Sequence, residues 1–220
     1  MYTNPYCGIA IAFDGIDGSS KSTQAKLMVK YLQDMGVHVV YTKEPWWGMM
    51  TEGDHKLRRA ITRLDNNKNA PAPDEIQKLF IDNRVRHLVW EVIPLLGQAS
   101  PTVVVMDRYA FSTMAYGAAT TPFTFEDIYR LHEGLKYFFL PDLSFIMEVD
   151  PKEALSRIKK SPDIFEDVEV LELVRNEYLR IAAFFKNEGA RLIDSSGTED
   201  AIFKQIKPHV DKLIMEKFRH

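Results

Sequence analysis

Residues 13–23, FDGIDGSSKST, combine the residue types that hold phosphate groups. Gly15 is followed, after four further residues, by Ser20, Lys21 and Ser22. This is the spacing of G-x-x-x-x-G-K-[ST], with serine in place of the second glycine. In such a loop, backbone N–H groups and a helix N-terminus bind phosphate oxygens, the lysine reaches the β- and γ-phosphates, and the hydroxyl binds Mg²⁺. The pattern predicts a nucleotide-binding loop, with a plain polar turn as the alternative.

Asp107 and Arg108 form a second candidate group, at the end of the apolar run 102–107. A carboxylate at the end of a buried strand commonly holds the Mg²⁺ of a bound nucleotide. An arginine beside it suits a phosphate group, because the guanidinium donates two parallel hydrogen bonds. A helix N-cap is the alternative for Asp107, and a surface ion pair is the alternative for Arg108. We expect a metal ligand and a phosphate ligand here.

Five short runs of apolar, mostly β-branched residues predict the strands that position these groups. The runs cover residues 8–13, 37–42, 102–107, 143–149 and 190–194. Their nearly continuous apolar character is typical of buried parallel strands. Helical patterns lie between them, so we expect an α/β fold with a doubly wound, parallel five-stranded sheet.

Three helical patterns are clear. Apolar residues recur at helical spacing over 25–35, where Gly36 supplies a stop, and again over 74–96 and 171–185. In a doubly wound sheet, ligands bind beyond the carboxyl ends of the strands. The glycine-rich loop, KEP (43–45) and DRY (107–109) follow the first three strands. We therefore expect them to converge on one site.

The composition indicates one soluble globular domain spanning residues 1–220. Apolar residues make up 45% of the chain, and the net charge of −3 gives no general attraction to nucleic acid or anionic membranes. Cys7 is the single cysteine, so no intrachain disulfide can form. The N-terminus has no basic leader, and no apolar run approaches the ~18 residues of a membrane span. We expect a cytoplasmic protein.

Six motifs occur in the order seen in one enzyme family. They are FDGIDGSSKSTQ, TKEP, LFIDNR, DRYAFSTMAY, PDLSFIMEVDPKEAL and DIFE. Together they resemble the thymidylate kinases, P-loop enzymes that phosphorylate dTMP, over nearly the whole chain. DRYAFS with the following Tyr116 is the most specific part. The resemblance implies phosphoryl transfer from ATP to dTMP with Mg²⁺, giving dTDP and ADP, by a homodimer.

The resemblance also implies roles for individual residues. Asp17 would bind the sugar 3′-hydroxyl, Phe80 would stack on thymine, and Tyr116 would occupy the space of a ribose 2′-hydroxyl. The whole implied dTMP site is Asp17, Lys43, Phe80, Arg84, Arg108, Ser112 and Tyr116. The implied ATP site is Gly15, Ile16, Asp17, Gly18, Ser19, Ser20, Lys21, Ser22 and Thr23. Ser22 and Asp107 would hold Mg²⁺, and Lys21, Arg108 and Arg157 would neutralise transition-state charge.

Residues 157–167 resemble the short lid that closes over ATP, with Arg157, Lys159 and Lys160 as its cations. A solvated helix end is the alternative for each lysine. DSSG (194–197) resembles the loop beside the adenine ring, although it could equally be a plain turn.

The chain departs from the family pattern at several positions. These are Asp14 in place of glutamate, Ser20 in place of glycine, Trp46 and Trp47 in place of small residues, and Ile164 in place of a lid arginine. Two other functions therefore stay open. A deoxynucleoside kinase would need a carboxylate base after the first strand, and Asp14 could serve. If Ser20 and Ile164 abolished turnover, the protein would be a catalytically silent nucleotide-binding regulator.

Overall fold

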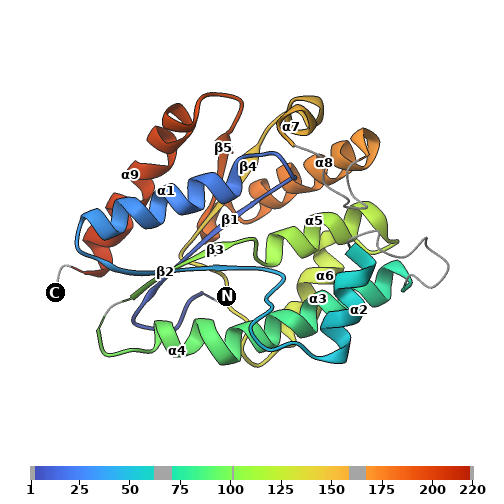
Figure 1. Ribbon diagram of the computed structural model, residues 1–220, viewed down its shortest axis with the longest axis horizontal. Helices are drawn as coiled ribbons and strands as arrows, with labels where there is room; N and C mark the ends of the chain where they lie inside the picture. The colour runs from blue at the N-terminus through green and yellow to red at the C-terminus, as the bar shows by residue number, and fades with distance from the viewer. Residues whose placement is uncertain (1–2, 62–70, 101, 159–166, 219–220) are drawn as a thin grey trace.

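The apolar runs form one parallel sheet in the order β2-β3-β1-β4-β5. The computed structural model describes residues 3–61, 71–100, 102–158 and 167–218 (Figure 1). The strands are β1 (Ile9–Gly15), β2 (His38–Lys43), β3 (Thr102–Asp107), β4 (Leu143–Glu148) and β5 (Ala190–Asp194). This arrangement confirms the predicted fold class.

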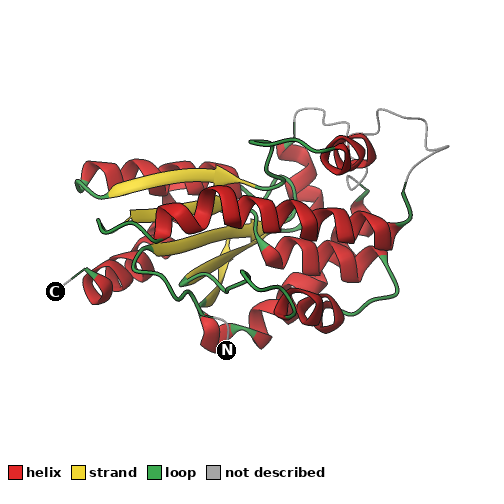
Figure 2. Ribbon diagram, turned by 90° about the horizontal axis from the view of Figure 1, so that it is seen from below, coloured by secondary structure: helices red, strands yellow, loops and turns green. Residues whose placement is uncertain are grey.

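Helices cover both faces of the sheet (Figure 2). They are α1 (Lys21–Asp34), α2 (Glu52–Ile61), α3 (Pro73–His87), the π-helix η1 (Leu88–Val92), α4 (Ile93–Leu96), α5 (Ala110–Thr120), α6 (Phe125–Glu133), α7 (Pro151–Arg157), α8 (Val168–Phe184), the 3₁₀ turn η2 (Lys186–Glu188) and α9 (Glu199–Lys217). Successive side chains of a strand point to opposite faces of the sheet, so those of β1 contribute to two separate hydrophobic cores. Ile9, Ile11 and Phe13 pack with α1 and α9, while Ala10 and Ala12 pack on the side of α5 and α8.

The helical pattern predicted over 74–96 is one helix interrupted by a π turn. The N–H of Ile93 bonds the carbonyl of Leu88, five residues earlier. The following residue is Pro94, which has no N–H, and whose ring would clash with the carbonyl four residues before it. The wider turn accommodates the proline without ending the helix.

α2 is the element that most affects the site and that the sequence patterns did not predict. It packs on α3, where Leu57, Ala60 and Ile76 form a small separate core. Through this contact α2 stands beside the carboxyl end of the sheet (Figure 1). No helix of the described residues is long and apolar enough to cross a bilayer.

Candidate active site

The loop after β1 has the backbone of an anion-binding turn. Gly18 has φ +80°, and a Cβ there would lie 2.1 Å from the carbonyl oxygen of Ala154. Ser20 also adopts a left-handed conformation, with φ 66° and ψ 8°, and the first intrahelical hydrogen bond of α1 runs from Gln24 N–H to its carbonyl. The first turn of α1 has no acidic residue. The free N–H groups and the helix dipole therefore favour a bound anion.

Lys21, Asp17 and Arg108 form a connected charge group beside this loop. Lys21 Nζ lies 3.0 Å from Asp17 Oδ1, and Arg108 Nη2 donates to the same oxygen. Burial alone would raise the pKa of Asp17, but the charges of Arg108 and Lys21 outweigh it and hold the pKa well below its usual range. Burial lowers the pKa of Lys21, and the charge of Arg108 adds to that, while the nearby carboxylates oppose both. The two cations lie where β1 and β3 end.

Arg108 has the second left-handed backbone among the described non-glycine residues, with φ 74°. Its Nη1 donates to the Gly15 carbonyl at 3.1 Å and to Ser112 Oγ at 3.2 Å. The guanidinium also lies over the Tyr116 ring, 5.4 Å from the centroid. Backbone strain of this kind persists only where the surroundings enforce it, and it is common at functional sites.

Asp107 is fully buried and accepts hydrogen bonds from two hydroxyl groups. Ser22 Oγ donates to its Oδ2 at 2.6 Å, Tyr41 donates to the same oxygen at 2.9 Å, and Lys43 Nζ lies 3.8 Å away. Burial and the Asp107 charge raise the pKa of Tyr41, so its phenol stays a donor. Asp107 Oδ1 has no partner in the part of the chain that the structure describes.

These oxygens fit Mg²⁺, which prefers carboxylate and hydroxyl ligands and keeps several waters. A buried carboxylate oxygen without a partner is the observation that supports the fit. No group of three or more His, Cys, Asp or Glu side chains within the described ranges could hold a metal. Phosphate oxygens of a nucleotide would complete the coordination of such an ion.

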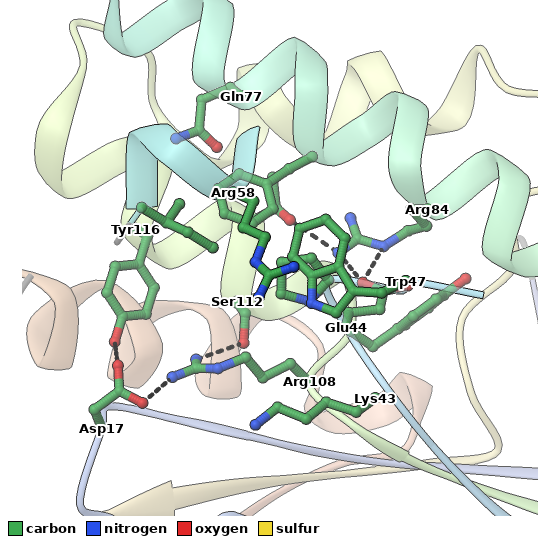
Figure 3. Close-up of a pocket in the computed structure, with 15 residues that line it drawn as sticks. Asp17, Lys43, Glu44, Trp47, Arg58, Gln77, Arg84, Arg108, Ser112 and Tyr116 are labelled. Atoms are coloured by element: carbon green, nitrogen blue, oxygen red, sulfur yellow. Dashed lines mark hydrogen bonds and ion pairs between the residues drawn. The ribbon is translucent and has the colours of Figure 1, made fainter. Parts of the chain in front are cut away.

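A cavity of about 280 Å³ opens beside the charge group, between the sheet edge, α2, α3 and α5 (Figure 3). All the residues predicted to bind dTMP line this cavity: Asp17, Lys43, Phe80, Arg84, Arg108, Ser112 and Tyr116. They come from the loop after β1, from β2, from α3 and from the β3–α5 region. The predicted convergence of the strand ends therefore exists in the structure.

Arg84 is held by a buried hydrogen-bond network. Its Nε donates to Glu44 Oε2 at 2.9 Å, Nη2 donates to the same oxygen and to Thr113 Oγ1 at 2.9 Å, and Nη1 lies 2.6 Å from His132 Nε2. His132 Nδ1 bonds the Ile128 carbonyl, so Nδ1 carries the proton and Nε2 accepts. Burial and the Arg84 charge lower the pKa of His132 to about 3, which keeps the ring neutral.

The structure adds cavity residues that the sequence motifs did not indicate. Arg58 and Ile61 come from α2, Gln77 comes from α3, and Trp47 stands at the edge of the cavity. The apolar residues Leu57, Ala60 and Ile61, at helical spacing in an otherwise polar segment, were the available signal for α2. The neighbouring tryptophan, Trp46, is not a cavity residue: its ring stacks on His87, with centroids 5.8 Å apart.

Asp14 serves as a cap and lies outside the cavity. Its Oδ1 accepts from the backbone N–H groups of Tyr109 and Ser112, both at 3.0 Å, at the start of α5. It is fully buried, and burial raises its pKa. The carboxylate therefore holds α5 against β1.

Arg157 joins the phosphate-binding loop to the loop after β5. Its Nη1 donates to the Ser195 carbonyl at 2.9 Å and approaches Gly18 O and Ser20 Oγ, both at 3.4 Å. This places the predicted lid cation at the phosphate loop and beside the DSSG segment. Lys159, Lys160 and Ile164 lie outside the described residues, as does most of the predicted lid.

Three features define a P-loop nucleotide kinase: a phosphate-binding loop after β1, a buried aspartate at the end of β3, and an adjoining cavity lined by charged and aromatic side chains. Comparisons with known proteins agree. The thymidylate kinase family model matches residues 13–206. A thymidylate kinase from Thermosipho africanus is 35% identical over 206 residues, 92% of this chain and 97% of that protein. One from Bifidobacterium longum is 30% identical over 213 residues, 94% of this chain and 98% of that protein.

A solved structure of thymidylate kinase from Candida albicans has the same fold, with a TM-score of 0.77 at 23% identity, covering 93% of this chain and 92% of that one. The chain belongs to the thymidylate kinase family. The predicted family is thereby confirmed.

Proposed function

We propose that this protein transfers the γ-phosphoryl group of ATP to dTMP and releases dTDP and ADP. Membership of the thymidylate kinase family supports the reaction. The observation that carries the site assignment is that every residue predicted to bind dTMP lines one cavity, beside the phosphate-binding loop. The acceptor phosphate is already an anion, so the reaction needs no general base.

The side chains act by positioning and by neutralising charge. The N–H groups of the loop hold the ATP phosphates, and Lys21 faces the transferring group. Arg108 holds the acceptor phosphate, since its guanidinium is fixed between the Gly15 carbonyl and Ser112. Asp17 contacts both cations and lines the cavity, where it accepts the sugar hydroxyl. Mg²⁺ at Ser22 and Asp107 would offset the charge of the β- and γ-phosphates.

A coupled ADP-release assay with a panel of acceptors tests the proposal. We expect turnover with dTMP, weaker turnover with dUMP, and none with thymidine. Turnover with thymidine and none with dTMP would identify a deoxynucleoside kinase. Tight MgATP binding without turnover on any acceptor would identify a silent regulator. Asp14 caps α5, an arrangement that favours the monophosphate as acceptor.

A further inference from the structure

Tyr41 of β2 is a partly buried tyrosine whose hydroxyl reaches the carboxylate at the end of the neighbouring strand. β2 pairs with β3 in parallel, with Lys43 opposite Asp107. Tyr41, two residues earlier, is therefore a diagonal neighbour of Asp107, at a separation that an aromatic side chain can span. Its ring packs against the core shared with α1 and α9, and its hydroxyl donates to Asp107 Oδ2 at 2.9 Å. The pairing of the strands thus brings this hydroxyl to the carboxylate.

Two hydroxyl groups use the hydrogen-bonding capacity of one oxygen of Asp107. A carboxylate oxygen accepts about two hydrogen bonds, and Oδ2 accepts one from Ser22 at 2.6 Å and one from Tyr41. Because Asp107 is fully buried, bulk water does not compete for that oxygen. The Ser22 proton points to Asp107, so the lone pairs of the Ser22 oxygen stay available to a metal ion.

Lys43 is the group that would take the place of the Tyr41 hydroxyl. Its Nζ lies 3.8 Å from the same Oδ2, beyond hydrogen-bond distance, and its side chain is 55% exposed. A lysine ammonium is a flexible donor, and it could move this short distance onto Asp107 if the oxygen lost a donor. A direct ion pair would neutralise the charge that attracts a divalent cation. It would also turn the lysine away from the cavity that it lines.

We propose that Tyr41 is a positioning residue for the Mg²⁺ of the bound nucleotide: its hydroxyl fixes the Asp107 carboxylate and keeps Lys43 from pairing directly with it. Hydrogen-bond partners of metal ligands typically contribute roughly ten- to a hundredfold to metal affinity. Tyr41 acts from outside the acceptor cavity, because it is not one of the residues that line it. This inference rests on the proposed function, since it assumes that MgATP binds at the loop after β1.

The test compares Tyr41→Phe, which removes only the hydroxyl, with Tyr31→Phe as a matched control. Tyr31 of α1 packs against the same core and also donates to a carboxylate, Asp211 Oδ1, at 2.6 Å. Calorimetry without an acceptor gives the Kd of ATP with excess Mg²⁺ and in EDTA. We expect Tyr41→Phe to raise the Kd with Mg²⁺ at least about tenfold and to leave the Kd in EDTA near the wild-type value. Tyr31→Phe should leave both values near wild type.

A second pair of variants tests the role of Lys43. Lys43→Gln removes the cation that would move onto Asp107. In the Lys43→Gln protein, the Tyr41→Phe change should therefore raise the Kd of MgATP by a smaller factor than it does in the wild-type protein.

Failure of the proposed function would be distinguishable. A wild-type protein that binds MgATP without turning over dTMP would contradict the function alone, whereas one that binds no MgATP would overturn both the function and this inference.

With a wild type that binds MgATP, an unchanged Kd of MgATP in Tyr41→Phe overturns the inference. Equal increases with Mg²⁺ and in EDTA would show a general distortion of the loop and also overturn it. An equal effect of Tyr41→Phe with and without Lys43 would do the same. A loss specific to Mg²⁺ that is smaller in the Lys43→Gln protein and absent from Tyr31→Phe supports it.

Discussion

Single side chains carry the electrostatics of the phosphate-binding loop. Lys21 is 5% exposed, its Nζ lies 3.0 Å from Oδ1 of the oppositely charged Asp17, and Arg108, which has the same charge as Lys21, bonds that same oxygen. A preorganised cation in such a dry site stabilises developing charge far more than an exposed one, because water no longer screens it.

Replacement of Lys21 by alanine should therefore lower kcat by at least ~100-fold. The fold should persist, because Asp17 keeps its ion pair with Arg108. Steady-state kinetics and a melting curve are the measurements. Lys26→Ala, at an exposed position on the same helix, should have near-normal kcat. Near-normal kcat in the Lys21 variant would refute the assignment of this loop.

Ser20 has the unfavourable conformation that glycine normally supplies. A left-handed backbone costs a residue with a Cβ about 1–2 kcal/mol, whereas a glycine loses about 0.4–1 kcal/mol more entropy on folding. Ser20→Gly should therefore raise the free energy of unfolding by about 0.5–1 kcal/mol, measured in urea. MgATP affinity and kcat should change by less than about tenfold, because both residues keep the backbone N–H.

Calorimetry with MgATP on both proteins is the measurement that could contradict this prediction. Wild type that binds no MgATP, beside a glycine variant that binds it well, would contradict an active loop and favour the silent regulator. A glycine variant of lower stability would instead show that the Ser20 hydroxyl contributes more than its 3.4 Å approach to Arg157 suggests.

At the scale of elements, α3 combines two functions on neighbouring faces. Leu79 and Phe80 both pack against the small core formed with α2, but of these two only Phe80 also lines the cavity. Packing of Phe80 in this small core and stacking of its ring on a base are therefore compatible. The packing role and the base-stacking role can be separated experimentally, because Leu79 also packs against the small core but does not line the cavity.

Phe80→Ala should raise KM for dTMP roughly ten- to a hundredfold, because stacking on a base is worth ~1–3 kcal/mol. KM for ATP should stay unchanged. Leu79→Ala should lower Tm comparably and leave both KM values at the wild-type level. If the two variants melted earlier and bound dTMP equally well, Phe80 would be a packing residue only.

At the scale of the whole molecule, Asp17 ties the loop after β1 to α1 and α5. Its carboxylate accepts hydrogen bonds from Lys21 of α1, from Arg108 at the end of β3, and from the Tyr116 hydroxyl of α5, the last at 3.2 Å. Its pKa is lower in the folded chain than the ordinary value of 3.8. The ionised carboxylate therefore stabilises the folded state above that value, and the stabilisation is lost as the pH falls below it.

Asp17→Asn should lower the free energy of unfolding at pH 7 by about 1–2 kcal/mol, a value reduced for partial exposure. The difference from wild type should narrow as the pH falls from 5 to 3, where the unfolded wild type takes up the proton first. Urea unfolding across this range is the measurement. Asp34→Asn, which removes an exposed ion pair, should show a small and constant difference. A gap that widens toward acid pH would contradict the low pKa.

Much of this protein follows from the sequence alone. All five strands and the three predicted helices lie within a few residues of their predicted positions, because apolar periodicity and β-branching act locally. The helix α9 was not predicted. The phosphate loop, Asp107 and the dTMP residues are likewise identifiable from contiguous motifs at the strand ends. Homodimer formation and the cytoplasmic location stay predictions.

Only the tertiary structure decided which further side chains meet at the site. Arg58 and Gln77 reach the cavity because α2 packs on α3 and α3 packs on α5. Glu44 and His132 hold Arg84 from 40 and 48 residues away along the chain. Such contacts depend on how helices cross, and no local spacing encodes that. The left-handed Ser20 has the same origin, since the fold imposes on serine a conformation that its own propensity disfavours.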